Sequence, residues 1–247
     1  MNTYRADLHI HTVLSPCGDL EMSPRNIVAA AKACGLNMIA ITDHNTTLHG
    51  PIVRKLAQPL GITVLYGAEV TTREEAHCLC LFNTDEQRLA FQEVIDTYLP
   101  NIPNVPKSFG YQVVVNENDE ILYEEEKSLF SALKLNVNQV QAAVYEIGGI
   151  FIPAHIDRPM FSLFSQLGFV PPELKFDALE IFRTTNPESF RKKYKHLSEC
   201  TLIKNSDAHL PSQIGQSFTA YRMESPTFDE LKLALAGAEG RGLSLEF

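Results

Sequence analysis

The sequence predicts an α/β fold, and its simplest form is one (β/α) barrel spanning residues 1–247 as a single domain, with an inserted excursion at about residues 84–135. Short apolar runs alternate with helical patterns at the tight spacing of βαβ units. Residues 38–41 are apolar throughout, which is typical of a parallel strand covered on both faces. With 247 residues, 45% of them hydrophobic, the chain can bury one sizeable core, as one barrel or two small domains.

The first part of the chain provides strands and helices in alternation. We expect its four strands at residues 3–10, 38–41, 62–70 and 77–82. Ser23 and Pro24 predict the start of a helix, as a cap and a first-turn proline, and Gly35 predicts its end. A second helix is expected over residues 51–60.

Residues 84–135 differ in character from what precedes them. A helix is expected over residues 86–98, followed by an irregular segment that contains three prolines. Residues 112–115 and 121–124 flank an acidic turn, which predicts a hairpin. We interpret the segment as an excursion from the barrel, either a lid over the site or surface decoration.

The α/β alternation resumes after residue 135. Further helices are expected at residues 138–147, 161–167 and 187–194, and further strands at 150–153, 178–182 and 201–205. Thr227 would cap a terminal helix over residues 227–236, with Glu230 completing a capping box. The strand at 201–205 is predicted to be the last before Asp207 and His209, and counting gives seven core strands.

The composition argues against several classes of protein. The formal net charge of −9 disfavours broad electrostatic binding to nucleic acid or anionic membranes, so nucleic acid is predicted to be an unlikely partner. No secretory signal is visible, and no apolar run approaches the roughly 20 residues that span a bilayer. Five irregularly spaced cysteines form no disulfide framework, and Cys78 and Cys80 are interpreted as core residues of a strand. A cytoplasmic location is the expectation, and the oligomeric state stays open.

Histidines recur at the borders of the strand-like runs. Six of the eight lie there: His9, His11, His44, His77, His155 and His209. One such histidine is more often a hydrogen-bonded core residue, but that explanation is poor for six at corresponding places. Side chains alternate along a strand, so His9 and His11 can chelate one ion from the same side. Strand ends share one face of a barrel, and imidazole with carboxylate suits zinc, manganese or iron. The sequence therefore predicts a polynuclear metal site.

The motifs DLHIHT, ITDHN, GAEV, HCLCLF, PAHIDRP and NSDAH resemble, in this order, those of the PHP (polymerase and histidinol phosphatase) family. The likeness spans residues 5–82 and 148–210 but not the excursion. It implies a distorted (β/α)7 barrel, similar to a TIM barrel, whose trinuclear metal centre hydrolyses phosphoesters. The implied cofactors are three divalent metal ions.

The resemblance also implies the ligands of each metal. The first metal would be bound by His9, His11 and Asp207. The second would be bound by His77, His155 and Glu69, which bridges it to the first, and the third by His44 and His209. Some relatives carry one more third-site ligand, a histidine, where this chain has Ser15-Pro16-Cys17, and others use an aspartate that aligns best with Asp19. We take Asp19 as that ligand and keep Cys17 as the alternative. Asp7 and Asp43 are expected to orient ligand histidines.

The predicted activity is a metal-dependent phosphoesterase acting on a phosphomonoester or nucleotide as its small-molecule substrate. A hydroxide bridging two metals would attack phosphorus, because metal binding lowers the pKa of water from about 15.7 to roughly 7. Glu69 would hold those metals, and Asp207 or a metal-bound water would protonate the leaving group. Arg158 would grip phosphate with its fork of donors, or else form only a surface salt bridge. The alternatives are a nuclease acting on nucleic-acid ends, an inactive metal-binding regulatory module, and an amidohydrolase-like metalloenzyme.

Overall fold

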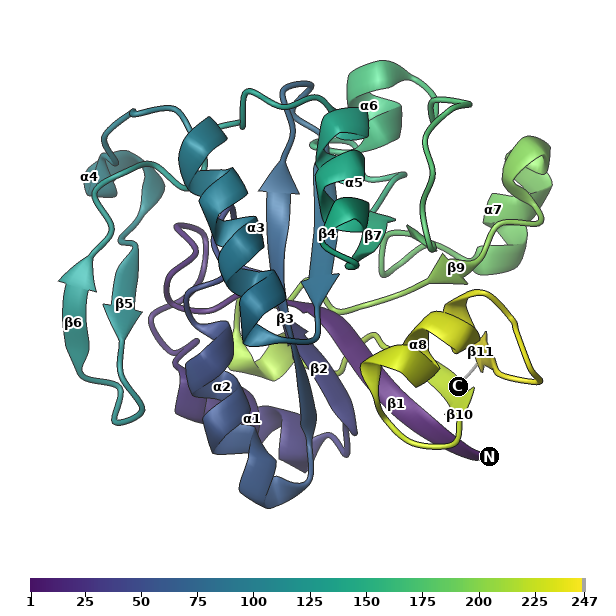
Figure 1. Ribbon diagram of the computed structural model, residues 1–247, viewed down its shortest axis with the longest axis horizontal. Helices are drawn as coiled ribbons and strands as arrows, with labels where there is room; N and C mark the ends of the chain where they lie inside the picture. The colour runs from purple at the N-terminus through teal and green to yellow at the C-terminus, as the bar shows by residue number, and fades with distance from the viewer. Residues whose placement is uncertain (246–247) are drawn as a thin grey trace.

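The computed structural model describes residues 1–245, and its centre is a curled seven-stranded sheet with helices packed on it (Figure 1). The strand order is β11-β10-β1-β2-β3-β4-β7. The seven strands are β1 (Asn2–Ile10), β2 (Met38–Ile41), β3 (Thr63–Thr71), β4 (His77–Phe82), β7 (Ile150–Pro153), β10 (Thr219–Met223) and β11 (Gly242–Ser244). Two small sheets pair β5 (Val113–Val115) with β6 (Ile121–Glu124), and β8 (Leu179–Glu180) with β9 (Leu202–Ile203). The predicted α/β class is confirmed.

The helices begin and end close to the predicted positions. They are α1 (Pro24–Ala33), α2 (Gly50–Ala57), α3 (Asp85–Tyr98), α4 (Pro106–Phe109), α5 (Val137–Glu146), α6 (Leu163–Leu167), α7 (Pro187–Lys193) and α8 (Phe228–Leu235), with 3-10 turns at Gln58–Leu60, Lys195–Leu197 and Pro211–Gln213. Ser23 caps α1 by accepting a hydrogen bond from the backbone N–H of Asn26. Thr227 caps α8 in the same way, but Glu230 binds the backbone N–H of Glu224 instead of completing a capping box.

The directions of the strands decide which residues share a rim of the sheet. β1, β2 and β3 run parallel, whereas β4 is antiparallel to both β3 and β7. Thr71 at the end of β3 therefore pairs with His77 at the start of β4, and Pro153 at the end of β7 pairs with Cys78. The carboxyl ends of β1, β2, β3 and β7 thus meet the amino end of β4 at one rim.

The sheet forms a curled half-barrel, and no regular ladder among residues 1–245 closes it into a ring. Single contacts continue the curl, because the backbone N–H of Ile156 donates to the carbonyl of Glu180 and Ile10 bridges to Ala208 in parallel. The predicted set of seven core strands did not include β10 and β11, which extend the sheet beyond β1 in antiparallel pairing. The sequence of β10 gives a weak strand signal, because it begins with Thr219 and Arg222 interrupts its apolar run.

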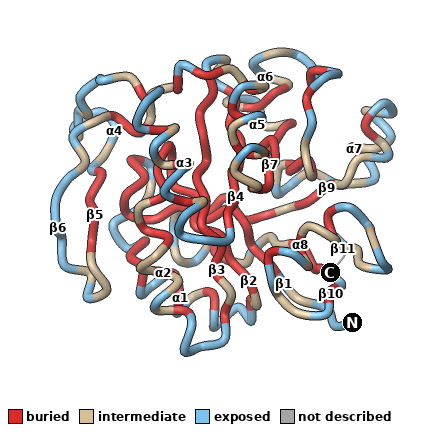
Figure 2. Tube along the Cα trace, in the orientation of Figure 1, coloured by how far each residue is buried: buried red, intermediate tan, exposed pale blue. Residues whose placement is uncertain are grey.

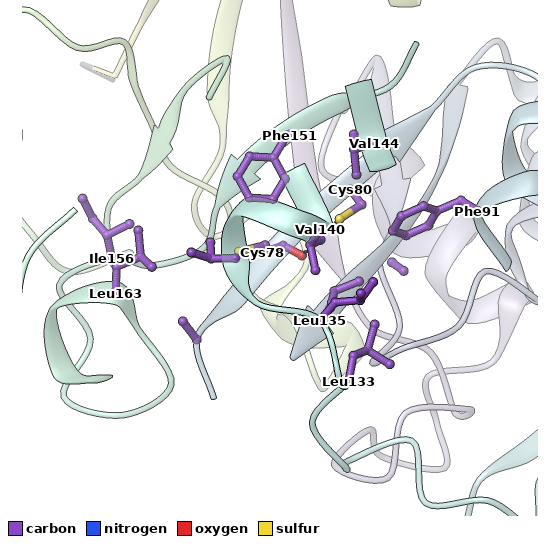
Figure 3. Close-up of a cluster of buried hydrophobic side chains, with 14 of the residues drawn as sticks. Cys78, Cys80, Phe91, Leu133, Leu135, Val140, Val144, Phe151, Ile156 and Leu163 are labelled. Atoms are coloured by element: carbon purple, nitrogen blue, oxygen red, sulfur yellow. Dashed lines mark hydrogen bonds between the residues drawn. The ribbon is translucent and has the colours of Figure 1, made fainter. Parts of the chain in front are cut away.

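The core lies on both faces of these strands, and the buried segments in Figure 2 follow the sheet. Figure 3 shows Cys78 and Cys80 of β4 beside Phe91, Val140 and Phe151. Both cysteines are fully buried, which confirms that they are core residues rather than a metal knuckle. Burying a side chain such as Phe91 contributes about 1.5–3 kcal/mol, so this cluster fixes α3 and α5 on the sheet.

Residues 84–135 contribute to two regions of the fold. Thr84 caps α3, whose Phe91 and Ile95 are buried with the core. The hairpin is confirmed as the antiparallel pair of β5 and β6, a sheet separate from the main one and at the side of the molecule (Figure 1). Among residues 1–245 no helix is long and apolar enough to cross a membrane.

Candidate metal centre

Imidazoles from four strand borders surround the carboxylate of Glu69, which is 1% exposed. Its Oε1 lies 2.9 Å from His77 Nδ1, 3.0 Å from His155 Nε2 and 3.2 Å from His9 Nε2. Its Oε2 lies 3.1 Å from His44 Nδ1 and 3.4 Å from His11 Nε2. Each distance is short enough for a carboxylate and an imidazole to share one cation.

A second carboxylate, Asp207, faces the same cluster from the loop after β9. Its Oδ1 lies 3.4 Å from the Nε2 atoms of both His9 and His11, and 3.7 Å from His209 Nδ1. The same oxygen is buried and makes no hydrogen bond. The structure therefore brings together all six predicted histidines, Glu69 and Asp207.

Local backbone geometry explains how these side chains reach the rim. The alternation of β1 puts His9 and His11 on one side, with their Nε2 atoms 3.2 Å apart. His44 follows β2 and forms a parallel bridge with Glu69 of β3. His155 and Asp207 have φ angles of 26° and 52°, in the left-handed region that costs a non-glycine residue about 1–3 kcal/mol. Such strain at two candidate ligands is typical of functional sites.

The electrostatics of the cluster favour a cation. Burial opposes the charge of Glu69, but the imidazoles of His77, His9 and His44 hold its pKa well below the usual value. Burial lowers the pKa of His44 and His77, and burial with the nearby His11 lowers that of His209 to about 4. An ionised carboxylate beside the neutral imidazoles of His44, His77 and His209 is the ligand form that metals require. His9 differs: burial opposes its charge, but Glu180, Glu69 and Asp207 raise its pKa well above the usual value, so a bound metal would have to displace its proton.

Three sets of ligand atoms are close enough to hold an ion each. Within each set the atoms lie within 4.8 Å of one another, and the sets are His9, His11 and Glu69; His44, Glu69 and His77; and His11, Cys17, His44 and His209. Glu69 belongs to two of the sets, as expected of a bridging ligand.

The structure places Cys17 and Asp19 differently. Cys17 Sγ lies 3.1 Å from His209 Nε2, inside the third set. Cys17 is exposed as a residue, but its thiol faces the cluster, and its removal from water together with the charges of Glu69 and Asp207 raises the pKa of Cys17. Asp19 is exposed, and its carboxylate accepts the backbone N–H of Glu21 at 2.8 Å within its own turn. The histidines are thus joined by Cys17 and not by Asp19.

Arg158 lies beside the cluster, next to Asp207. Its Nη1 is 3.2 Å from Asp207 Oδ2, and its side chain is 30% exposed. The ion pair involves a candidate ligand, so it is not the ordinary surface salt bridge that the sequence left open. The guanidinium retains further donors on the solvent side.

Glu180 is a buried carboxylate that the sequence reasoning missed. Its Oε2 lies 3.1 Å from His9 Nδ1 and accepts the backbone N–H of His155 at 2.8 Å. Its Oε1 accepts the side-chain N–H of Asn205 at 2.7 Å. A lone carboxylate within the apolar run of residues 178–182 was the available signal, because a charge in such a strand needs a partner.

Asp7 and Asp43 support the site through loops. Asp43 accepts hydrogen bonds from Thr12 and from Ser15 Oγ, which lies 3.0 Å from His11 Nδ1. Asp7 accepts the backbone N–H groups of Ser206 and Gly215. Asp43 therefore orients His11 through a serine, whereas Asp7 fixes the loop that carries Asp207.

Three phenylalanines border the histidines on one side. Phe161 stacks on His77 with ring centroids 4.9 Å apart, and Phe130 meets His44 edge-on at 5.5 Å. Phe109 at the end of α4 stacks at 6.2 Å from Phe130 and is 50% exposed. We call Phe109, Phe130 and Phe161 the aromatic wall; through the first two, residues 84–135 reach the metal centre.

Comparison with known sequences gives a family match and two curated relatives. The model of the PHP domain matches residues 7–143. An uncharacterized protein of Methanocaldococcus jannaschii, MJ1587, is 42% identical over 78 residues, which cover 28% of this chain and 46% of that protein. The Bacillus subtilis protein YqxK, also uncharacterized, is 33% identical over 107 residues, covering 41% of this chain and 27% of that protein. The chain thus spans less than half the length of either relative.

Solved structures share the fold at low sequence identity. Endonuclease Q of Pyrococcus furiosus, a lesion-specific endonuclease, superposes with a TM-score of 0.74 at 22% identity, over 98% of this chain and 58% of that one. A Bifidobacterium adolescentis protein, provisionally assigned as a metal-dependent phosphoesterase, superposes with a TM-score of 0.62 at 19% identity, over 94% and 96%.

The prediction that nucleic acid is an unlikely partner was wrong. An endonuclease Q complex with a 27-mer duplex, whose abasic lesion lies at the active site, shares this fold with a TM-score of 0.75 at 22% identity, over 98% of this chain and 58% of that one. The net charge of −9 describes the whole surface. It does not describe the local potential at a cluster of side chains able to hold cations, so it cannot exclude a phosphodiester there.

Proposed function

Because the chain belongs to the PHP domain family, we propose that it is a metal-dependent phosphoesterase working through three divalent ions at the rim of the sheet. The observation that carries the proposal is the position of Glu69, whose two oxygens lie within 3.4 Å of five imidazoles. Such a set suits zinc, manganese or iron rather than calcium or magnesium, which prefer oxygen ligands. The ligands come from both ends of the chain, which supports residues 1–247 as one functional domain.

The roles of the residues follow from their positions. When bound, divalent ions supply a strong nucleophile from water at neutral pH and offset the charge on phosphoryl oxygens. Glu69 would be shared by two of the ion sites, and His9, His11 and Asp207 would hold the first ion. Burial opposes the charge of Asp207, but the nearby His9 and His11 hold its pKa well below the usual value, so its buried Oδ1 would serve as an ion ligand rather than carry a proton to the leaving group. Arg158 can bind a phosphoryl oxygen with the donors that Asp207 leaves free.

The test measures hydrolysis of a panel of phosphate esters by the full chain, after its metal has been removed and then restored as manganese or zinc. The His9→Ala/His155→Ala double variant should bind fewer ions and lose hydrolysis by at least about 100-fold, because two ligands of the centre are gone. The control is His196→Ala, which removes an exposed histidine outside the cluster. Full metal occupancy without turnover on any substrate would favour the inactive regulatory module. Activity retained by the metal-depleted double variant would exclude the proposal.

A nuclease is the second candidate, and the aromatic wall favours it. Stacking of a base on an aromatic side chain is worth about 1–3 kcal/mol and tolerates any base. Phe109 is half exposed beside the centre, where a base attached to the bound phosphate can reach it. The Phe109→Ala variant should lose activity on an oligonucleotide by about 5-fold or more while hydrolysing a simple aryl phosphate as before. Equal effects on both substrates would argue against the nuclease.

A further inference from the structure

We propose that the thiolate of Cys17 is a metal ligand, completing the third ion site together with His11, His44 and His209. The inference rests on the proposed metal-dependent function and deepens it. Ligand atoms of these four residues lie within 4.8 Å of one another, and Cys17 Sγ is 3.1 Å from His209 Nε2. The rings of His11 and His209 stack with centroids 4.3 Å apart, so the two imidazoles lie side by side in this set.

The loop that carries Cys17 is held in place from two sides. On one side it is fastened to the loop of His209, whose carbonyl accepts the backbone N–H of Asp19 at 3.0 Å. On the other side Gly110, at φ +94°, approaches so closely that a Cβ there would lie 2.1 Å from the carbonyl oxygen of Pro16. Gly18 is equally tight, because its Cβ would lie 2.2 Å from the carbonyl oxygen of Thr12. The thiol is therefore positioned by packing and not by a freely moving loop.

A buried imidazole independently indicates a missing partner. His44 is 4% exposed, and its Nδ1 makes no hydrogen bond although it lies 3.1 Å from Glu69 Oε2. An unsatisfied buried nitrogen is costly, and a cation bound by His44 would remove that cost. Asp19 belongs to none of the three ligand sets, and its carboxylate accepts a hydrogen bond within its own turn.

A thiolate changes which ion the third site prefers. Binding replaces the thiol proton by the metal, so one proton is released to solvent for each ion bound through sulfur. Thiolate with imidazoles selects zinc over manganese, whereas the sets built on Glu69 combine imidazole with carboxylate. The third site should therefore be zinc-selective within a centre whose other sites accept harder metals.

Cobalt(II) is the probe, because a cobalt–thiolate bond gives a charge-transfer absorption in the near ultraviolet that imidazole and carboxylate do not. The metal-free chain reconstituted with cobalt should show the band, and Cys17→Ser should lose it and bind one ion fewer. Asp19→Asn and Cys34→Ser should keep both. Cys34 is the matched control, since it is also exposed and lies outside the histidine set.

A second measurement does not depend on the folding of a variant. In the unsubstituted protein, zinc should protect Cys17 at least about tenfold from iodoacetamide, located by mass spectrometry, while Cys34 reacts equally with and without zinc. A band that persists in Cys17→Ser, a lost ion in Asp19→Asn, or an unprotected Cys17 in zinc-loaded protein would overturn the inference. Bound ions without the band would overturn it and leave the phosphoesterase proposal standing, whereas failure to bind any ion would remove that proposal itself.

Discussion

Replacing Glu180 by glutamine tests whether this buried carboxylate increases the metal affinity of the centre through its contact with His9. Its two oxygens face His9 Nδ1, the backbone N–H of His155 and the side-chain N–H of Asn205. His9 points its other nitrogen toward Glu69 and Asp207. Glu180 therefore fixes the tautomer and orientation of a candidate ligand, and its charge increases the basicity of that ligand.

The expected magnitude follows from this geometry. Loss of such an orienting carboxylate typically weakens metal binding by about 10- to 100-fold. Glutamine keeps one acceptor oxygen but presents its N–H₂ to donors, so at least one buried donor loses its acceptor, at about 1–3 kcal/mol in the free energy of unfolding. Both effects should appear together, the first in competition with a zinc chelator and the second in urea denaturation of the metal-free chain.

Glu188→Gln is the matched control, because it removes the same charge from an exposed position on α7. Its pair with Lys192 spans 3.5 Å between side chains that are 73% and 80% exposed, so zinc affinity should not change. Zinc affinity of Glu180→Gln within twofold of the unsubstituted protein, with only urea stability reduced, would refute the reasoning. Glu180 would then serve the fold and not the metal.

Three further predictions concern the phosphate grip, the Cys17 loop and the pH dependence of folding. Arg158→Ala should lower kcat/KM for a phosphate ester by about 10- to 100-fold, since it removes a charged hydrogen bond to the substrate. The control is Arg73→Ala, which removes an exposed arginine. An equal loss of kcat/KM in both variants would contradict phosphate binding by Arg158. Gly110→Ala should lower the free energy of unfolding in urea by about 1–3 kcal/mol more than Gly168→Ala, because both glycines have positive φ but only Gly110 lies against a backbone carbonyl, that of Pro16. Equal decreases in the two variants would show that the close contact between Gly110 and Pro16 is unimportant. Burial raises the pKa of Asp177 above its ordinary 3.8, so the folded chain binds this proton more tightly than the unfolded chain and loses stability as pH rises through the higher value. The Asp177→Asn variant lacks that loss, so its stability relative to the unsubstituted protein should increase with pH in this window, and a pH-independent difference would exclude the effect.

Several features of the centre could be predicted from the residues alone. The alternation of side chains in a strand determines that His9 and His11 point the same way, because covalent geometry fixes a period of two. The apolar runs at 38–41, 77–82 and 150–153 predicted buried strands, and the structure has strands with those bounds. The motifs at the ends of these runs correctly identified the family, since each holds chemistry-bearing residues within a few positions.

Other features depend on how distant segments pack. The antiparallel direction of β4, which delivers His77 from the start of its strand, depends on pairing with β3 and β7. The strands β10 and β11 form on an edge that exists only once β1 is in place. No periodicity along the chain records either fact, because pairing is a long-range choice.

The same distinction applies to the third ion site. The sequence offered Cys17 and Asp19 two residues apart, and the family resemblance favoured Asp19, although both residue types bind metals. The tertiary structure places Cys17 among the histidines, because Gly110 lets its backbone approach the loop on one side and the carbonyl of His209 binds the loop on the other. The local sequence thus determined which residue types lie at the strand ends that form the rim. Close packing between segments about 90 and 190 residues apart determined which side chain faces the cluster.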